Sequence, residues 1–196
     1  MIFAIRHGET LWNKEGRVQG GGSDSPLTKL GIETAHELGK RLKEYNIDVI
    51  YSSDLGRAKQ TTDIINSFLH KKIVYSELLR ETNYGIAEGI KSSDLDNNIE
   101  LNRISSQVDA GDNNAHFKGG ESRNIVYNRF MVFLNLLPID KNVLISTHGG
   151  ILRTFTKISV DIDKKIPNCG GIQFEIDQDR RPCHINLFNL LEKEIK

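Results

Sequence analysis

Short apolar runs alternate along this chain with longer segments in which apolar residues recur every three or four positions. The runs include residues 2–5, 47–51 and 143–147, and the helical segments include 28–45 and 122–137. Apolar runs that do not alternate with polar residues are typical of strands buried on both faces. The pattern therefore predicts an α/β protein with a largely parallel sheet.

Local signals predict where several elements begin. Thr28, Asp54 and Ser122 each precede a segment of helical period, and each has a side chain that can accept a hydrogen bond as an N-cap. Near the end of the chain, residues 171–177 and 183–187 have strand character and are separated by a polar turn. We expect these two segments to form a hairpin at an edge of the sheet.

The length of 196 residues fits a single domain, with an insertion at about 82–120 where the sequence becomes rich in Asn, Asp and Ser. A structureless segment of that length is unusual in a compact domain, so one or two short helices and a role as a lid are expected there. Two cysteines, Cys169 and Cys183, are too few for a disulfide framework.

Charge and hydropathy narrow the classes of partner. Lysine plus arginine and aspartate plus glutamate number 26 each, so the net charge is zero and nucleic acid is disfavoured. Every apolar run is far shorter than the roughly 20 residues that a membrane-spanning helix needs. The first residues lack the basic and apolar regions of a secretory signal, so we expect a cytoplasmic protein with no membrane partner.

Three apolar runs each end in polar residues that suit an anion. Arg6-His7-Gly8-Glu9 follows the first run, Ser52-Ser53-Asp54 and then Arg57 follow the second, and Thr147-His148-Gly149-Gly150 completes the third. In open α/β sheets, ligands bind beyond the carboxyl ends of the strands. Two arginines and two histidines gathered there predict a cationic pocket for a phosphoryl group.

The segment Arg6-His7-Gly8-Glu9-Thr10, followed by Gly16-Arg17-Val18-Gln19-Gly20, closely resembles the signature of the histidine phosphatase superfamily, the phosphoglycerate mutase-like proteins. Further blocks that resemble the family follow in order: Pro26-Leu27-Thr28, Ser52-Ser53-Asp54-Leu55 with Arg57, Leu79-Arg80-Glu81, Gly119-Gly120-Glu121-Ser122 and Thr147-His148-Gly149-Gly150. They extend the resemblance to about residue 155. It implies a three-layer α/β/α sandwich with a mixed, mainly parallel sheet, and a covalent phosphohistidine mechanism with no metal and no cofactor.

The resemblance also implies residue roles. His7 would be the nucleophile that takes up the phosphoryl group. Arg6, Arg57 and His148 would neutralise its oxygens, and Glu81 would protonate the leaving oxygen and then activate water. The substrate-binding residues implied are Asn13, Gln19, Gly20, Ser23 and Gly149. The plain alternatives are a buried structural histidine for His7 and a solvated loop carboxylate for Glu81.

Three features favour a phosphatase, which hydrolyses its ester, over a mutase, which returns the phosphoryl group to a substrate hydroxyl. The sequence after Glu81, which ends Gly85-Ile86-Ala87-Glu88-Gly89, resembles the phosphatase form, whereas the mutases typically have Arg-His-Tyr-Gly there. Cofactor-dependent mutases are generally longer. The insertion, moreover, carries only Lys91, Arg103 and Lys118 as fixed cations, few for holding a second phosphate.

The sequence therefore predicts a metal-independent phosphatase. Its expected partner is a small polar phosphomonoester, with a phosphorylated protein left open. The alternatives are a 2,3-bisphosphoglycerate-dependent phosphoglycerate mutase and a non-catalytic phosphate-binding regulatory module. One departure from the family pattern is the spacer 21–25, which is one residue longer than usual and lacks the common aromatic residue.

Overall fold

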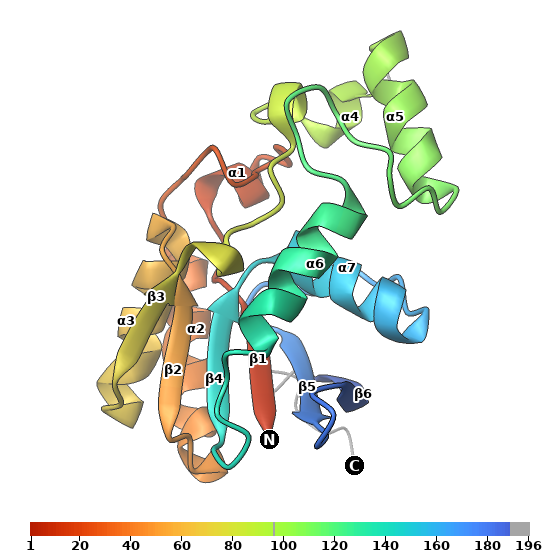
Figure 1. The fold of residues 1–196 in the computed structure, drawn as a ribbon. Helices are drawn as coiled ribbons and strands as arrows, with labels where there is room; N and C mark the ends of the chain where they lie inside the picture. Colours follow the sequence, from red (N-terminus) through yellow and green to blue (C-terminus); the bar gives the residue numbers. More distant parts are fainter. Residues whose placement is uncertain (96, 189–196) are drawn as a thin grey trace, which may run out of the picture.

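The computed structural model describes residues 1–95 and 97–188, in which six strands form one sheet in the order β3-β2-β4-β1-β5-β6 (Figure 1). The strands are β1 (Ile2–Arg6), β2 (Val49–Ser53), β3 (Ile73–Ser76), β4 (Val143–Thr147), β5 (Gly171–Ile176) and β6 (Pro182–Phe188). Strand β4 pairs in parallel with β1 and β2, and β2 pairs in parallel with β3. Strands β5 and β6 are antiparallel, so the sheet is mixed and mainly parallel as expected, with the predicted hairpin at its edge.

Helices cover both faces of this sheet. Helices α2 (Lys29–Leu42) and α3 (Gly56–Leu69) pack on one face, and α6 (Arg123–Leu134) and α7 (Gly149–Val160) pack on the other (Figure 1). Two separate apolar clusters result, one between the sheet and each helical layer. The three-layer sandwich is therefore confirmed.

Two of the three predicted N-caps are present. The Thr28 side chain accepts from the backbone N–H of Gly31, and Ser122 caps α6 in the same way. The prediction for Asp54 is wrong, because the N-cap of α3 is Leu55 and makes no side-chain cap. The Asp54 carboxylate instead accepts from Arg80 Nε at 2.8 Å, since a guanidinium is a stronger partner than a backbone N–H.

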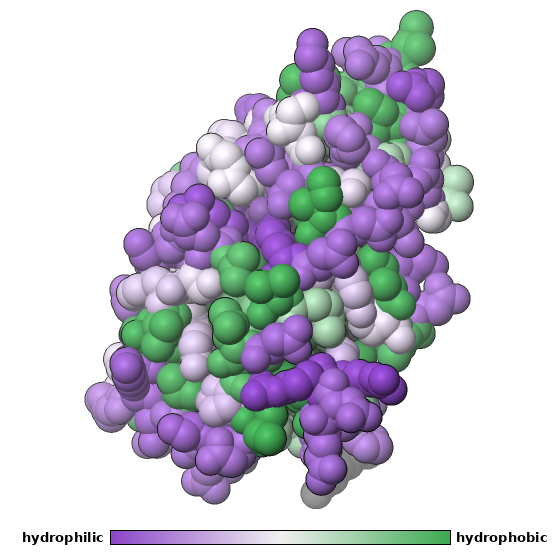
Figure 2. Space-filling view, viewed as in Figure 1, coloured by the Kyte–Doolittle hydropathy of each residue, from purple (hydrophilic) through white to green (hydrophobic). Residues whose placement is uncertain are grey.

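Shorter elements complete the chain. They are α1 (Leu11–Lys14), α4 (Ser92–Leu95), α5 (Ile99–Asp109) and the 3₁₀ turns η1 (Lys43–Tyr45), η2 (Glu77–Leu79) and η3 (Gly85–Ala87). Helices α4 and α5 lie in the insertion and stand above the carboxyl edge of the parallel strands, apart from the sandwich (Figure 1). The surface of this upper part is largely hydrophilic (Figure 2). The short helices expected in the insertion are therefore present.

Within residues 1–95 and 97–188, no helix combines the length and the apolar character needed to span a bilayer.

Candidate active site

The carboxyl ends of β1, β2 and β4 meet at one edge because these strands run parallel. Arg6 lies opposite Thr147 in the register of β1 and β4, and Ser52 lies opposite Ser146 in that of β2 and β4. A cleft of about 690 Å³ opens at this edge, lined also by the insertion and by the segment between α7 and β5. The size suits a small molecule.

His7 follows β1 directly and is buried, at 3% exposure. Its Nδ1 lies 2.7 Å from the carbonyl oxygen of Gly8, and because a carbonyl can only accept, Nδ1 carries the proton. The Nε2 atom therefore keeps a lone pair. Burial, and then the charges of Arg6 and Arg57, hold the pKa of His7 well below its usual range, so the ring is neutral.

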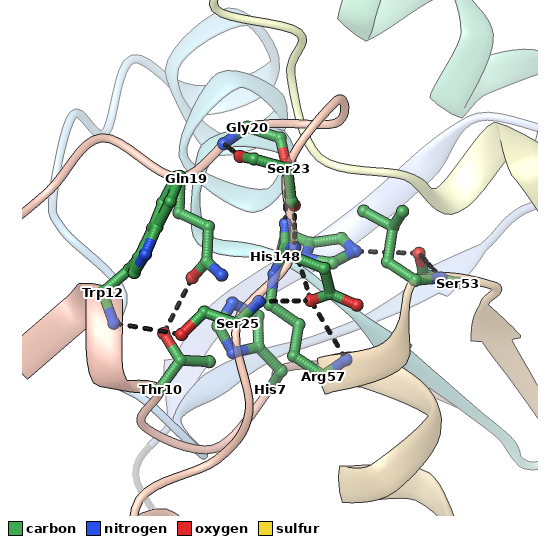
Figure 3. A network of polar contacts seen from close by, with 12 residues as sticks. His7, Thr10, Trp12, Gln19, Gly20, Ser23, Ser25, Ser53, Arg57 and His148 are labelled. Carbon is green, nitrogen blue, oxygen red and sulfur yellow. Dashed lines mark hydrogen bonds and ion pairs between the residues drawn. The ribbon is translucent and has the colours of Figure 1, made fainter. Parts of the chain in front are cut away.

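His148 lies beside His7, with ring centroids 5.2 Å apart and planes inclined by 60°. Its Nε2 is 2.8 Å from the hydroxyl of Ser53, and that hydroxyl accepts from the backbone N–H of Leu55 (Figure 3). The Ser53 proton is thus free to be donated to Nε2. Burial, followed by the charge of Arg57, lowers the pKa of His148 well below its usual range.

Two buried arginines flank the histidine pair. Arg57 has a fully buried side chain and donates to the carbonyl oxygens of Ser23 at 2.8 Å and Gly20 at 3.0 Å (Figure 3). Arg6 donates from Nη1 to the carbonyl oxygen of Ile166 at 2.9 Å. The Nε atoms of both arginines have no hydrogen-bond partner among the described residues. Arg6 and His7 line the cleft, whereas Arg57 and His148 do not and lie next to its lining residues.

Glu81 reaches the same edge from the loop after η2. Its carboxylate accepts from the backbone N–H groups of Thr82 at 2.8 Å, Gly150 at 2.9 Å and Ile151 at 3.1 Å. A Cβ atom on Gly150 would lie only 2.4 Å from Glu81 Oε1 and 2.5 Å from the Tyr84 hydroxyl. Glycine at position 150 therefore lets the carboxylate dock on the start of α7.

The remaining predicted residues divide into two groups. Asn13, Gln19 and Gly149 line the cleft. Gln19 Oε1 accepts from the Thr10 hydroxyl at 2.8 Å, which leaves Gln19 Nε2 without a partner among the described residues. Gly20 and Ser23 do not line the cleft. Their backbone carbonyl oxygens instead accept hydrogen bonds from the Arg57 guanidinium.

Asn168 lines the cleft but belongs to none of the sequence motifs that indicated the site. Its Nδ2 donates to the backbone carbonyl of His7 and to Asn13 Oδ1, each at 3.0 Å. Asn168 lies just before β5, and an antiparallel strand begins at the edge where its parallel neighbours end. The predicted hairpin at 171–187 was therefore a signal that could have drawn attention to this residue.

Tyr84 is a second residue that sequence reasoning passed over. It lines the cleft, and burial together with the charge of Glu81 raises the pKa of its hydroxyl. The hydroxyl therefore stays protonated and can act as a donor beside Glu81.

In the part of the chain that the structure describes, one group of three potential metal ligands is present, Glu175, Cys183 and His184 on the β5–β6 hairpin. Gly171 of β5 lies opposite Ile5, near the carboxyl end of β1, and Phe174 lies opposite Ile2, at its amino end. The group is thus at the far end of β5 from the cleft.

A mainly parallel sheet covered by helices on both faces, with two histidines and two buried arginines at its carboxyl edge beside a cleft, defines an α/β protein with a candidate site at the strand ends. The model of the histidine phosphatase superfamily (branch 1) matches residues 2–185. The chain belongs to this family, as its motifs indicated.

Similar proteins carry both phosphatase and mutase names. Probable phosphoglycerate mutase GpmB of Yersinia pestis (strain Pestoides F) is 38% identical over 151 residues, which are 76% of this chain and 69% of that protein. The structure of YhfR from Bacillus stearothermophilus is 28% identical, with a TM-score of 0.82 and 95% of each chain covered. A mycobacterial glucosyl-3-phosphoglycerate phosphatase has a TM-score of 0.82 at 24% identity, covering 96% of this chain and 98% of that one.

Proposed function

We propose that this protein is a phosphatase that hydrolyses a polar phosphomonoester through a phosphohistidine intermediate on His7. The observation that carries the proposal is the state of that ring. It is neutral, and its Nδ1 proton is committed to the Gly8 carbonyl, so that Nε2 is a ready nucleophile.

In the first step, Nε2 of His7 attacks phosphorus and the bond from phosphorus to the ester oxygen breaks. The unpaired Nε–H groups of Arg6 and Arg57 donate to the phosphoryl oxygens as the charge redistributes. His148 accepts at Nε2 from Ser53, so its proton is on Nδ1, where it is a further donor. The protein supplies this positive charge from its own side chains, and we expect activity to persist in a chelator.

Glu81 acts as the general acid in the first step and as the general base in the second. Its carboxyl gives a proton to the departing oxygen, and the resulting carboxylate later takes a proton from the water that attacks the phosphohistidine. The phosphorus–nitrogen bond then breaks, inorganic phosphate leaves and His7 is regenerated. The three backbone donors around Glu81 hold it in place for both transfers.

A second candidate is a phosphoglycerate mutase primed by 2,3-bisphosphoglycerate, and the name of the Yersinia pestis relative favours it. In that reaction the phosphoryl group returns from His7 to a second hydroxyl rather than to water. The phosphatase-like sequence after Glu81 favours hydrolysis. A non-catalytic phosphate-binding module is disfavoured because both the histidine and a carboxylate are in place.

Phosphorus NMR distinguishes these functions. The purified protein is given 3-phosphoglycerate and other polar phosphomonoesters, with a chelator and a 2,3-bisphosphoglycerate primer present. A phosphatase makes the inorganic phosphate signal grow, whereas a mutase yields 2-phosphoglycerate without it. If no phosphorus signal changes with any of the esters, the result would contradict both enzymatic functions for small-molecule substrates.

The His7→Ala variant tests the mechanism. We expect turnover to be lost while circular dichroism stays that of the folded protein. His36→Ala, an exposed histidine on α2, is the matched control and should retain activity. Undiminished turnover in a folded His7→Ala protein would overturn the proposal.

A further inference from the structure

Arg6 lines the cleft at the His7 end, and Arg17, which is paired with Glu15 at 2.6 Å, also lines it. A further set of cations lines the cleft besides these two. Arg123 is the first residue of α6, Arg153 lies in the first half of α7, and Lys165 lies on the segment between α7 and β5. We call these three residues the second basic cluster. None of them belongs to the insertion, whose own cations are Lys91, Arg103 and Lys118. The count of cations within the insertion therefore misses the positive charge that other elements bring to the cleft.

Arg123 is the buried member of the cluster, at 9% exposure. Its Nη2 donates to Asp163 at 3.3 Å, while its Nη1 has no hydrogen-bond partner within residues 1–95 and 97–188. A buried guanidinium with an unmet donor is costly unless a partner arrives. A guanidinium at the wall of a cleft forms its strongest hydrogen bonds with carboxylate or phosphate oxygens.

The cluster keeps a net positive charge because one carboxylate serves two arginines. Asp163 accepts from Arg123 through one oxygen and from Arg153 Nε through the other. Partial burial works to raise the pKa of Asp163, but the hydrogen bond and charge of Arg153, aided by Arg123, outweigh it and lower that pKa. Asp163 is thus anionic, and Arg123, Arg153 and Lys165 leave an excess of positive charge.

The acidic residues that line the cleft are mostly committed elsewhere. Glu9 accepts from the Thr28 hydroxyl at 2.7 Å, and Glu121 pairs with Arg129 at 2.9 Å. Glu81 is held by backbone N–H groups. Asp109, exposed on α5, is the remaining lining carboxylate. These contacts leave the positive excess of the second basic cluster largely unopposed.

We propose that the second basic cluster binds a second anionic group of the substrate, a carboxylate being the simplest, while His7 receives the phosphoryl group. The inference rests on the proposed function and narrows its substrate class to phosphomonoesters that also carry an acid group. A cleft of about 690 Å³ has room for both ends of such a small molecule.

Matched esters test this directly. O-phosphoserine and O-phosphoethanolamine differ by one carboxylate, as do 3-phosphoglycerate and glycerol 3-phosphate. We expect wild-type kcat/KM to be at least tenfold higher for the acid of each pair, since a charge-assisted hydrogen bond typically contributes that much. Arg123→Gln should lower kcat/KM about tenfold for the acids and leave it unchanged for the two other esters.

Two further variants guard against misfolding. Lys165→Gln changes an exposed side chain and should reduce the acid preference without affecting stability. Arg103→Gln removes an arginine of α5 that does not line the cleft, and it should leave the preference unchanged. Equal losses for both members of a pair, or an unaltered preference in both the Arg123 and the Lys165 variants, would overturn the second anion site.

Calorimetric binding separates this inference from the proposed function. If the protein binds 3-phosphoglycerate more tightly than glycerol 3-phosphate and Arg123→Gln abolishes the difference, the second anion site stands even where no hydrolysis is seen. If both esters are hydrolysed and bound equally well, the phosphatase stands and the second anion site fails.

Discussion

His7 is fixed from two sides, because its ring donates to the Gly8 carbonyl while its own carbonyl accepts from Asn168. The same Asn168 amide donates to Asn13 Oδ1 and so orients the Asn13 side chain, whose Nδ2 donates to Gln19 Oε1 at 3.4 Å. One side chain just before β5 therefore aligns the nucleophile with a predicted phosphate-binding residue. Asn168 lines the cleft, but both hydrogens of its amide are donated to protein atoms, so we assign it a positioning role.

We expect Asn168→Ala to lower kcat about tenfold with little change in KM, because small misplacements of a nucleophile weaken the chemical step more than binding. Steady-state kinetics on a hydrolysed ester measure the split. Asn142→Ala is the matched control, since its amide donates to the carbonyls of Tyr45 and Asn46 at the amino edge of the sheet. Equal kcat losses in the two variants would indicate a general effect on the fold.

The buried neutral histidines should make stability depend on pH. The folded-state pKa values of His7 and His148 lie well below the unfolded value, so the unfolded chain binds more protons once the pH falls below about 6.5. The contribution of these two histidines to the free energy of unfolding is complete above that pH and is lost as the pH falls below it. Each contributes a slope of up to about 1.4 kcal/mol per pH unit.

Urea unfolding between pH 7.5 and 5.0 tests this slope, at values spaced by roughly half a unit around the reference pKa of histidine. We expect His148→Gln to make the loss of stability on acidification shallower than in the wild type. The His116→Gln control changes an exposed histidine of the insertion and should keep the wild-type slope. Parallel curves for wild type and His148→Gln would refute the assignment of a buried neutral ring.

At the scale of elements, the start of α7 is where helix and active site depend on each other most. The backbone N–H groups of Gly150 and Ile151 have no intrahelical acceptor so early in the helix, and Glu81 satisfies them. The Glu81 carboxylate thus satisfies the N-terminal N–H groups of α7, and these hydrogen bonds fix the position of the carboxylate. Gly150 makes this close approach of Glu81 possible, and Gly149 next to it leaves room for the Arg6 side chain.

Replacing each glycine with alanine should give graded effects. A Cβ on Gly150 would meet Glu81 Oε1 at 2.4 Å, whereas one on Gly149 would meet Arg6 Nε at 3.1 Å. We expect Gly150→Ala to reduce kcat at least tenfold and Gly149→Ala to reduce it less. Helix α7 should persist in both variants, because alanine favours the helical conformation. Rates and circular dichroism of the two variants check the order, and a reversed order would contradict the geometry.

Element prediction succeeded where one local interaction decides the structure. Thr28 and Ser122 cap their helices by accepting through the hydroxyl oxygen. The Thr28 hydroxyl also donates its proton to Glu9, which leaves the oxygen available for the cap. Asp54 failed as a cap because Arg80, 26 residues later in the chain, binds its carboxylate. The second strand begins at Val49 rather than at residue 47, although Ile47 is still buried at 2% exposure. Apolar character reports burial, and the hydrogen-bond ladder sets the boundary.

At the scale of the whole molecule, the sequence located the site because parallel strands end at a common edge. That rule brings His7, Arg57 and His148 together without any knowledge of side-chain contacts. It could not indicate the second basic cluster, whose members lie on α6, on α7 and on the segment between α7 and β5. The tertiary packing of these elements brings the three residues to one cleft, and Arg123 and Arg153 share Asp163 there.

The order of strands in the sheet also governs how the chain can fold during synthesis. Strand β1 leaves the ribosome first, yet both of its neighbours, β4 and β5, come from the last third of the chain. At typical elongation rates, roughly ten to thirty seconds pass before β4 exists to pair with it. Throughout that interval the apolar segment Ile2–Arg6 has no native strand partner, and an unpaired apolar strand is prone to aggregation until its neighbours have been made.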